Sequence, residues 1–397
     1  MNDAVIIQVK RTAVGKAKKG ALRNIRPDTL ASQVILQLLK EVPALKAEEI
    51  GDVILGCAMP EGEQGLNIAR IVALNAHLPI EVPGMTINRF CSSGLQSIAL
   101  AADRICSGVD SAILAGGVES MSMVPMGGYK MAPNPDIVDS YPGIYISMGL
   151  TAERVAEKYK ISRQAQDEFS LKSHQKASVA LESGRFRTEI CPIQIKEEKL
   201  LTKPKNKKWV ETEFLTFQTD EGPRKETSLE ALMKLKPAFK AEGTVTAGNS
   251  SQMSDGAACA LVMSASRAQE LGLKPMARFV TYAVAGVEPE LMGMGPVKAI
   301  AKALKQAGLT LSQIGLIELN EAFAAQALAV IQEIQIDPQK VNVNGGAIAL
   351  GHPLGCTGAK LTATLLNEMK ARQIQFGMVT MCVGGGMGAA GIFELVA

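Results

Sequence analysis

Short apolar runs alternate with amphipathic helical patterns through the first 120 residues. Residues 4–9 and 52–55 are β-type runs, and residues 29–39 place several leucines on one face of a predicted helix. Residues 111–115 form a further apolar run, which we expect to be a buried strand that ends at Gly116. Strands and helices in this order predict a layered α/β domain.

The pattern changes after this segment. Residues 121–150 are rich in Met, Pro, Gly and Tyr and show no clear period, and long segments of this kind inside compact proteins are usually functional. Residues 151–183 indicate helices, with Ser162 as an N-cap. We interpret residues 121–245 as an inserted loop domain that covers a site.

The layered pattern resumes near residue 243, and the order of its elements repeats that of the first part. In the first part, a turn of small residues at 91–95 is followed by a helix, a strand at 113–115 and a glycine pair. The same order occurs again late in the chain. There, residues 355–361 open a helix, and a strand at 378–383 ends at three glycines. This internal similarity predicts a duplicated fold, with one site built at the junction of its halves.

We therefore expect three parts. Residues 1–120 plus 246–274 form the first half, residues 121–245 the inserted loop domain, and residues 275–397 the second half. The full length of 397 residues agrees with more than one core.

Composition narrows the class of protein. Hydrophobic residues make up 47% and charged residues 20%, as in a globular enzyme. A net charge of +3 without interleaved basic and aromatic stretches gives no support for nucleic-acid binding. The lysine-rich residues 196–208 could meet a ligand phosphate, but a solvated surface loop is the better interpretation.

Cysteine and histidine usage argues against a metal site. The seven cysteines include no Cys-x-x-Cys pair, and the three histidines form no His-Glu-x-x-His motif. Scattered, unpaired cysteines fit a reducing compartment. The first residues lack a signal-peptide layout, and no apolar stretch is long enough to span a bilayer, so we expect a cytoplasmic protein without membrane insertion.

The candidate nucleophile is Cys91, in the segment NRFCSSGLQ at residues 88–96. A strand-like run precedes it and a helical pattern follows it, so the thiol lies at a strand-to-helix turn. The free N–H groups and positive dipole end of that helix favour a thiolate. A buried structural cysteine is the alternative, but small neighbours leave this sulfur approachable.

The second half supplies three stretches with candidates to act with Cys91. Asn320 and Glu321 stand where a strand runs into an Ala-rich helix, although an N-cap and a helix-dipole carboxylate would look the same. His352 lies in a glycine-rich loop that matches no phosphate-binding pattern, and it is the histidine best placed to take the Cys91 proton. His77 and His174 look like plain helix surface or edge. Cys382 precedes a triple glycine, and residue types alone leave it as core packing or as an acid/base with an oxyanion site beside it.

Together these segments resemble the thiolase family over essentially the whole chain. The matching stretches are NRFCSSG at 88–94, AGGVESMS at 115–122, NEAFA at 320–324, GGAIALGHPLG at 345–355 and CVGGG at 382–386. The resemblance implies a five-layered α-β-α-β-α fold with two similar halves and an inserted loop domain. Coenzyme A is implied as a substrate, and no prosthetic group is implied.

The resemblance also implies catalytic roles. Cys91 would become acylated, and His352 would accept its proton. His352 and Asn320, through a bound water, would stabilise the thioester oxygen of acetyl-CoA. Cys382 would move the proton at the adjacent carbon, and the backbone N–H groups of Cys91 and Gly384 would form a second oxyanion hole.

Coenzyme A contacts follow in the same way. Arg224 would stack on adenine and Ser251 would bind the pantetheine arm, although a surface arginine and a turn serine are the plain alternatives. Ser147, where acetoacetyl-CoA-forming relatives tend to have histidine, could leave room for a longer acyl chain lined by Met148. Cys356 stands where alanine is expected, and a small core residue is its simplest interpretation.

We therefore predict thiolytic cleavage of 3-oxoacyl-CoA to acyl-CoA and acetyl-CoA in fatty acid β-oxidation. The alternatives are acetoacetyl-CoA synthesis, a decarboxylating ketoacyl synthase, and a silent lipid-binding or partner subunit. The resemblance suggests a homodimer or homotetramer, and a β-oxidation partner subunit is possible.

Overall fold

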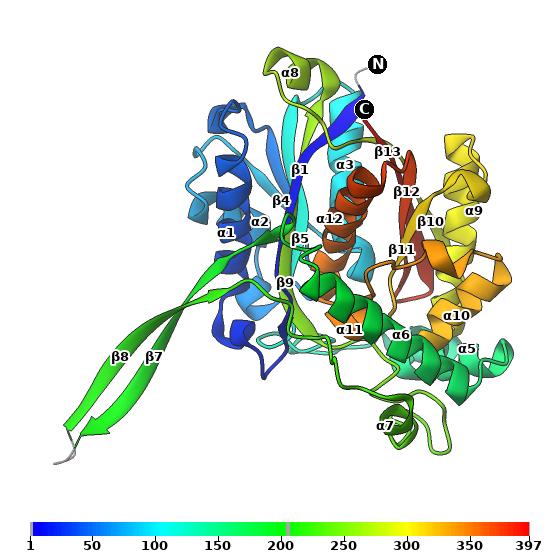
Figure 1. Ribbon diagram of the computed structural model, residues 1–397. Coiled ribbons are helices and arrows are strands. Elements are labelled where there is room, and N and C mark those ends of the chain that lie inside the picture. Colours follow the sequence, from blue (N-terminus) through cyan, green and yellow to red (C-terminus); the bar gives the residue numbers. More distant parts are fainter. Residues whose placement is uncertain (1–2, 204–206, 397) are drawn as a thin grey trace.

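The computed structural model describes residues 3–203 and 207–396. Its centre is a mixed β-sheet built from two halves (Figure 1). The first half has the strand order β4 (Gly84–Ile87), β3 (Asp52–Gly56), β5 (Ala112–Ser120), β9 (Ser254–Ser264) and β1 (Ala4–Thr12). The second has the order β11 (Leu316–Leu319), β12 (Phe376–Val383), β13 (Met387–Leu395) and β10 (Ala277–Gly286). A two-residue antiparallel pairing, Val5 with Arg278 and Ile6 with Ala277, joins β1 to β10.

The two halves repeat one pairing scheme, which confirms the predicted duplication. In the first half, β3 is parallel to β4 and β5, while β9 runs antiparallel to β5 and β1. In the second half, β11 is parallel to β12, while β13 runs antiparallel to β12 and β10. A parallel bridge between Ile317 and Val341 occupies the place of β4.

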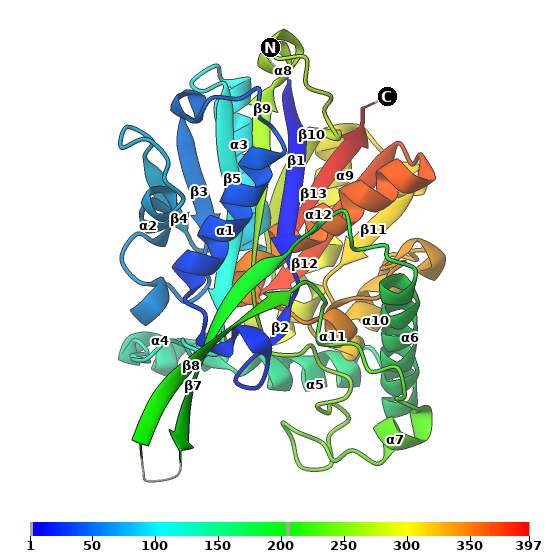
Figure 2. The same cartoon turned by 60° about the vertical axis from the view of Figure 1, so that its left-hand side comes forward.

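Helices cover both halves and fill the space between them. The outer helices are α1 (Pro27–Lys40) and α2 (Ile68–Asn75) on one side and α9 (Gly295–Ala307) and α10 (Ala324–Glu333) on the other. Helices α3 (Ser93–Cys106) and α12 (Leu354–Arg372) lie side by side in the middle (Figures 1 and 2). The result is the five-layered α-β-α-β-α fold expected from the sequence.

Glycine allows the two central helices to approach closely. A Cβ on Gly94 would lie 2.8 Å from the backbone nitrogen of Ala359, and one on Gly358 would lie 2.2 Å from that of Leu95. Neither position can hold a side chain without moving the partner helix. The glycine in each helix start therefore sets the spacing of the layer that carries Cys91.

The first glycine pair differs from the prediction. Strand β5 continues through Gly116 and Gly117 to Ser120, so the expected end of the strand at Gly116 is wrong. A Cβ at Gly116 would meet the carbonyl oxygen of Ala258 at 2.0 Å, and one at Gly117 would meet that of Gly355 at 2.0 Å. These glycines serve close packing, whereas the triple glycine after β12 does form a turn, with positive φ at Gly385 and Gly386.

The inserted segment carries helices around one end of the sheet and a long hairpin. Its helices are α4 (Pro135–Ser140), α5 (Met148–Lys158), α6 (Arg163–Glu182) and α7 (Leu229–Met233). Ser162 caps α6 as predicted, because its hydroxyl accepts from the N–H of Ala165. The residue limits predicted for the insert and the two halves stay a prediction.

The lysine-rich segment lies largely in strands. β7 (Ile193–Lys203) and β8 (Lys207–Phe217) pair in antiparallel register and project from the body in both views (Figures 1 and 2). The prediction of a plain loop at 196–208 is therefore wrong, and residues 204–206 lie outside the described residues. The alternation of apolar and polar residues at 193–196 was the overlooked strand signal.

The remaining elements are short. They are β2 (Gly15–Lys16), β6 (Ile190–Cys191), α8 (Ala265–Glu270), α11 (Ala347–Leu350) and 3₁₀ turns at Ala21–Asn24, Ala47–Glu49, Gly62–Gln64, Phe90–Ser92, Pro142–Tyr145, Pro289–Met294, Leu311–Gln313 and Pro338–Lys340. Across residues 3–203 and 207–396, no helix has the length and apolar character needed to cross a membrane.

Candidate active site

Cys91 sits in a tight turn between β4 and α3. Phe90, directly before it, has a φ of +42°, a sparsely populated conformation for a residue with a side chain. The side chain of Asn88 accepts from the N–H of Phe90 at 2.8 Å. Ser93 accepts from the N–H of Arg89 at 2.8 Å and donates to the carbonyl of Phe90 at 2.7 Å. These bonds hold the strained turn that presents the thiol.

The electrostatics of Cys91 differ from the expectation of an acidic thiol. Burial raises the pKa of the thiol to about 12, and hydrogen bonds from the backbone N–H groups of Gly384 and Cys91 itself only partly offset this. Desolvation therefore outweighs the favourable end of the helix. The same two N–H groups were expected to form an oxyanion hole, and both lie at the sulfur.

Cys382 lies at the end of β12, close enough to Cys91 for the two thiols to interact electrostatically. It is fully buried, and burial followed by the proximity of Cys91 raises its thiol pKa. Its side chain belongs to an apolar cluster with Phe323, against which Met148 packs. The structure thus brings the two cysteines, Gly384 and Met148 together.

His352 and Asn320 form a second group. The imidazole Nε2 lies 3.3 Å from the Asn320 Nδ2, and Nδ1 lies 2.6 Å from the hydroxyl of Thr357. Burial, and then the charge of Lys360, lowers the pKa of His352 to about 3, so its imidazole is neutral at physiological pH. The Oδ1 of Asn320 is buried and has no partner among the described residues. An acceptor of this kind suits a bound water.

The alternative roles considered for Asn320 and Glu321 do not apply. The N-cap of α10 is Phe323, not Asn320. The Glu321 carboxylate accepts from Ser173 at 2.7 Å, from the Asn342 side chain at 2.9 Å and from the N–H of Ile348 at 3.2 Å. Burial raises its pKa. Glu321 anchors the glycine-rich loop that leads to His352.

Glu119 is a buried residue next to the site that the sequence reasoning did not single out. Its fully buried carboxylate accepts from the N–H groups of Ala58 at 2.8 Å, Met59 at 3.2 Å and Gly355 at 2.8 Å, and from the Gln64 amide at 2.7 Å. Burial raises its pKa. A charged residue at the end of an otherwise apolar buried strand was the available signal.

Cys91 meets the His352 loop through packing. Its side chain packs against a small cluster formed by Ala58, Met121 and Leu354, and Leu354 follows His352 by two residues. Glu119 holds the backbone on both sides of that cluster. Cys356, in contrast, is a buried core residue with a thiol pKa raised by burial to about 12.

The two coenzyme A candidates differ in their exposure. Arg224 is exposed and lines a surface hollow of about 500 Å³ with its three following residues. Ser251 is half-buried, and its N–H donates to the carbonyl of Ala322 at 2.9 Å.

The structure contradicts the prediction made for His174. We expected helix surface, but it is buried and its Nδ1 accepts from the N–H of Arg224 at 3.1 Å. Burial, and then Arg224 and Lys16, lowers its pKa to about 4. The buried polar face of α6 was the missed signal, because Gln166, Ser170 and Ser173 recur at helical spacing with it.

The arrangement is that of an acyl-transfer enzyme that works through a cysteine thioester. It combines a cysteine at a strained turn, N–H groups at its sulfur, a second buried thiol and a neutral imidazole.

Comparison with known proteins agrees. Residues 4–266 match the family described as "Thiolase, N-terminal domain" and residues 273–395 match "Thiolase, C-terminal domain". The chain belongs to the thiolase family.

Its relatives are similar over their full length. The chain is 54% identical to a 3-ketoacyl-CoA thiolase of Bacillus subtilis (strain 168) over 395 residues, covering 100% of both chains. It is 47% identical to a 3-ketoacyl-CoA thiolase of Escherichia coli O1:K1 / APEC over 408 residues, again covering 100% of both. The crystal structure of the Bacillus anthracis acetyl-CoA acetyltransferase superposes with a TM-score of 0.90 at 42% identity, covering 100% of this chain and 99% of that one.

Proposed function

We propose that this chain catalyses the thiolytic cleavage of a 3-oxoacyl-CoA by coenzyme A, giving acyl-CoA and acetyl-CoA, as in fatty acid β-oxidation. The observation that carries the proposal is the meeting of Cys91, Cys382 and the Gly384 N–H at one point. The two relatives named 3-ketoacyl-CoA thiolase, at 54% and 47% identity, support this reaction.

In the first half-reaction, the Cys91 sulfur attacks the 3-oxo carbon of the substrate and its proton passes to His352. The N–H groups of Cys91 and Gly384 stabilise the oxyanion that forms. The bond between C2 and C3 then breaks, leaving the acyl group on Cys91 and expelling the enolate of acetyl-CoA. His352, Asn320 and a water stabilise the enolate oxygen, while Cys382 donates a proton to C2.

In the second half-reaction, free coenzyme A collects the acyl group. Its thiol gives a proton to the Cys382 thiolate and attacks the Cys91 thioester, which restores the Cys91 sulfur as leaving group. That sulfur recovers its proton from His352, so the enzyme returns to its starting state. With pKa values of about 12 for Cys91 and about 3 for His352, both groups are neutral at rest. The proton must therefore move as the carbon–sulfur bond forms.

The buried Cys382 favours this reaction over a decarboxylating synthase, which has no need of a proton donor at C2. Acetoacetyl-CoA synthesis uses the same groups in reverse and remains the second candidate because of the acetyl-CoA acetyltransferase neighbour. The higher identity to the 3-ketoacyl-CoA thiolases favours the degradative reaction. Arg224 and Ser251 would hold coenzyme A, and Met148 would line the acyl chain.

The test is acylation of Cys91. Incubation with an acyl-CoA should add one acyl mass to the Cys91 peptide. Cys91→Ser should show no adduct and no turnover, while Cys382→Ser should still acylate but lose thiolysis by roughly 10²–10⁴-fold, as expected for removal of an acid/base group. The buried Cys356→Ser is the matched control and should keep both. Unchanged thiolysis in Cys382→Ser would contradict the proton-transfer role.

We also propose a cytoplasmic homodimer or homotetramer. Strand β4 ends the sheet order, so one of its edges carries backbone groups that a second copy could pair with. Light scattering of the purified protein tests this, and a monomer at micromolar concentration would contradict it. Co-purification with an enzyme of the preceding β-oxidation steps would identify a partner subunit.

A further inference from the structure

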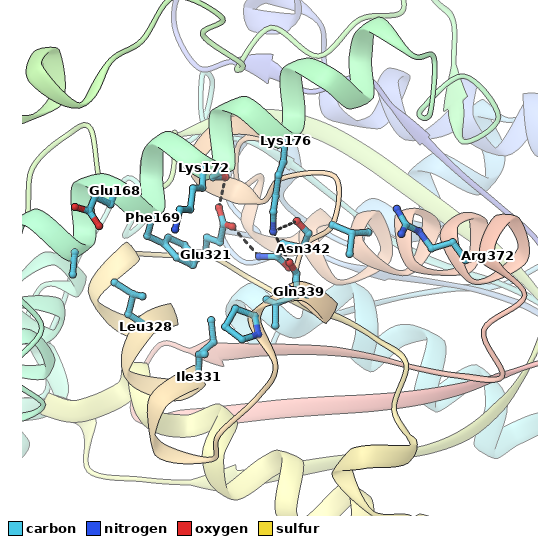
Figure 3. Close-up of a pocket in the computed structure, with 15 residues that line it drawn as sticks. Glu168, Phe169, Lys172, Lys176, Glu321, Leu328, Ile331, Gln339, Asn342 and Arg372 are labelled. Atoms are coloured by element: carbon cyan, nitrogen blue, oxygen red, sulfur yellow. Dashed lines mark hydrogen bonds between the residues drawn. The ribbon is translucent and has the colours of Figure 1, made fainter.

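A long cavity lies on the face of α6 that is turned toward α10 and the segment at residues 338–343 (Figure 3). Its main part has a volume of about 600 Å³. A second hollow of about 460 Å³ continues past Lys176 and shares Lys176, Val343 and Arg372 with the first. Volumes of this size are typical of sites for small organic ligands. None of Cys91, His352, Cys382 or Asn320 lines either hollow.

One end of the cavity is apolar. Phe169 of α6 and Leu328 and Ile331 of α10 line it, and all three belong to the hydrophobic packing of the second half. Phe169 and Leu328 are only half-buried, so their side chains present apolar surface that water can reach. A hydrocarbon chain placed there would remove this surface from water.

The other end carries positive charge. Lys176 reaches this end from α6 and Arg372 stands away from Leu328 and Ile331, whereas Lys172 lies beside Phe169 (Figure 3). The Nζ of Lys176 donates to the carbonyl oxygens of Val341 at 3.0 Å and Asn342 at 3.2 Å, which are neutral acceptors. Its charge is therefore held in place but not cancelled by these bonds.

The acidic groups do not balance this charge. Arg372 and Arg185 share one carboxylate, Glu368, at 2.6 and 3.9 Å. The three hydrogen bonds of Glu321 come from neutral donors, so its charge still acts on Lys176 and offsets part of the positive charge, while Glu168 lies at the apolar end (Figure 3). The head end thus presents Lys176 and two arginines that share a carboxylate.

We propose that this cavity binds an anionic single-chain amphiphile. Its hydrocarbon chain lies against Phe169, Leu328 and Ile331, and its carboxylate or phosphate head lies between Lys176 and Arg372. An anion in this position gains charge-assisted hydrogen bonds from groups already oriented toward it. The site is separate from the catalytic cysteines, so its occupant does not compete with coenzyme A.

Isothermal titration calorimetry of the full chain tests the proposal, with dodecanoate and dodecyl phosphate as probes. We expect at least one of the two anions to bind with a stoichiometry of one per chain, and at least tenfold more tightly than dodecanol or dodecyltrimethylammonium. The two anions distinguish a carboxylate from a phosphate head. Equal binding of dodecanol would overturn the proposal, as would the absence of binding by both anions.

Variants locate the site. Lys176→Met and Arg372→Met should each weaken binding of the anion at least tenfold, and Leu328→Trp should fill the apolar end and abolish it. Lys370→Met is the matched charge control, because Lys370 is exposed on the same helix as Arg372 and lines neither hollow. If Leu328→Trp unfolds, the two charge variants decide the result.

Competition with coenzyme A separates this proposal from the proposed function. Saturating coenzyme A should leave the affinity for the anion unchanged. Displacement of the anion by coenzyme A, with unchanged binding in the Lys176 and Arg372 variants, would place the ligand in the acyl site and refute the separate site. Failure of the Cys91 acylation test would not affect either measurement.

Discussion

The Oε2 of Glu119 lies 2.8 Å from the backbone nitrogen of Gly355, whose N–H it accepts. The same oxygen accepts from the N–H of Ala58 in the other half of the fold, also at 2.8 Å. Ala58 packs beside Cys91, and Gly355 follows His352 by three residues. One buried carboxylate therefore fixes the two loops on either side of the candidate nucleophile.

Glu119→Gln should damage both stability and turnover. An amide has one acceptor oxygen, so its NH₂ group must face N–H donors that now lack a partner. We expect a loss of about 2 kcal/mol of unfolding free energy, in line with buried unsatisfied donors. Displacement of the two loops should lower kcat/KM by about 10²-fold, as small misplacements of reacting groups do. Urea unfolding and steady-state thiolysis measure these effects, and Glu48→Gln, at an exposed position, is the control. Parent-like kinetics would show that Glu119 does not position the site.

Alkylation should report the raised pKa of Cys91. Because only the thiolate reacts and the pKa is about 12, the iodoacetamide rate at Cys91 should rise about tenfold per pH unit from pH 7 to 10 without a plateau. Mass spectrometry of the Cys91 peptide follows the rate, and the exposed Cys106 in the same sample provides a reference. A plateau near pH 7 would show instead that the helix end acidifies the thiol.

His174 should make the protein less stable as the pH falls. Its pKa in the folded state is about 4, below the usual 6.5, so between these values the unfolded chain binds a proton that the folded chain does not. The His174→Gln variant lacks the imidazole that takes up this proton on unfolding. The unfolding free energy of the variant relative to the parent should shift by ~2 kcal/mol in favour of the variant between pH 7 and 4.5. The same difference should stay constant between pH 7 and 8, and a constant difference down to pH 4.5 would contradict the burial of a neutral imidazole.

Ser147→His should narrow the range of substrates. We expect kcat/KM to fall about tenfold for long 3-oxoacyl-CoA substrates while cleavage of acetoacetyl-CoA is retained, since one bulky group in an apolar channel changes discrimination by about 1–3 kcal/mol. Ser147 also caps α5 by accepting from the N–H of Leu150, so Ser147→Asn, which can keep the cap, is the matched control. A thiolysis series across chain lengths measures the effect. Equal losses on all substrates would place Ser147 outside the acyl channel.

The sequence alone determined the alternation of strands and helices in the two halves, the duplication and the turn that carries Cys91. These features rest on short-range patterns, such as a helical repeat after Cys91 or an apolar strand before the triple glycine at residue 384. Such patterns act through neighbours in the chain, and they remain readable without a structure. The five family motifs added the identity of the candidate catalytic groups. Each motif is a short continuous stretch of the chain, so it can be recognised without a structure.

Only the tertiary structure decided how these groups meet. Asn320 lies beside His352, and Glu119 binds the backbone of Gly355, a residue 236 positions away. The pKa of Cys91 rises because segments distant in sequence, which carry Ala58, Met121 and Leu354, pack around it, a desolvation that no local pattern reports. Gly116 is required by the approach of β9, and His174 is buried by the loop of Arg224. In each case the physical cause is a segment distant in sequence, and so the chain pattern predicted the chemical groups but not their environment.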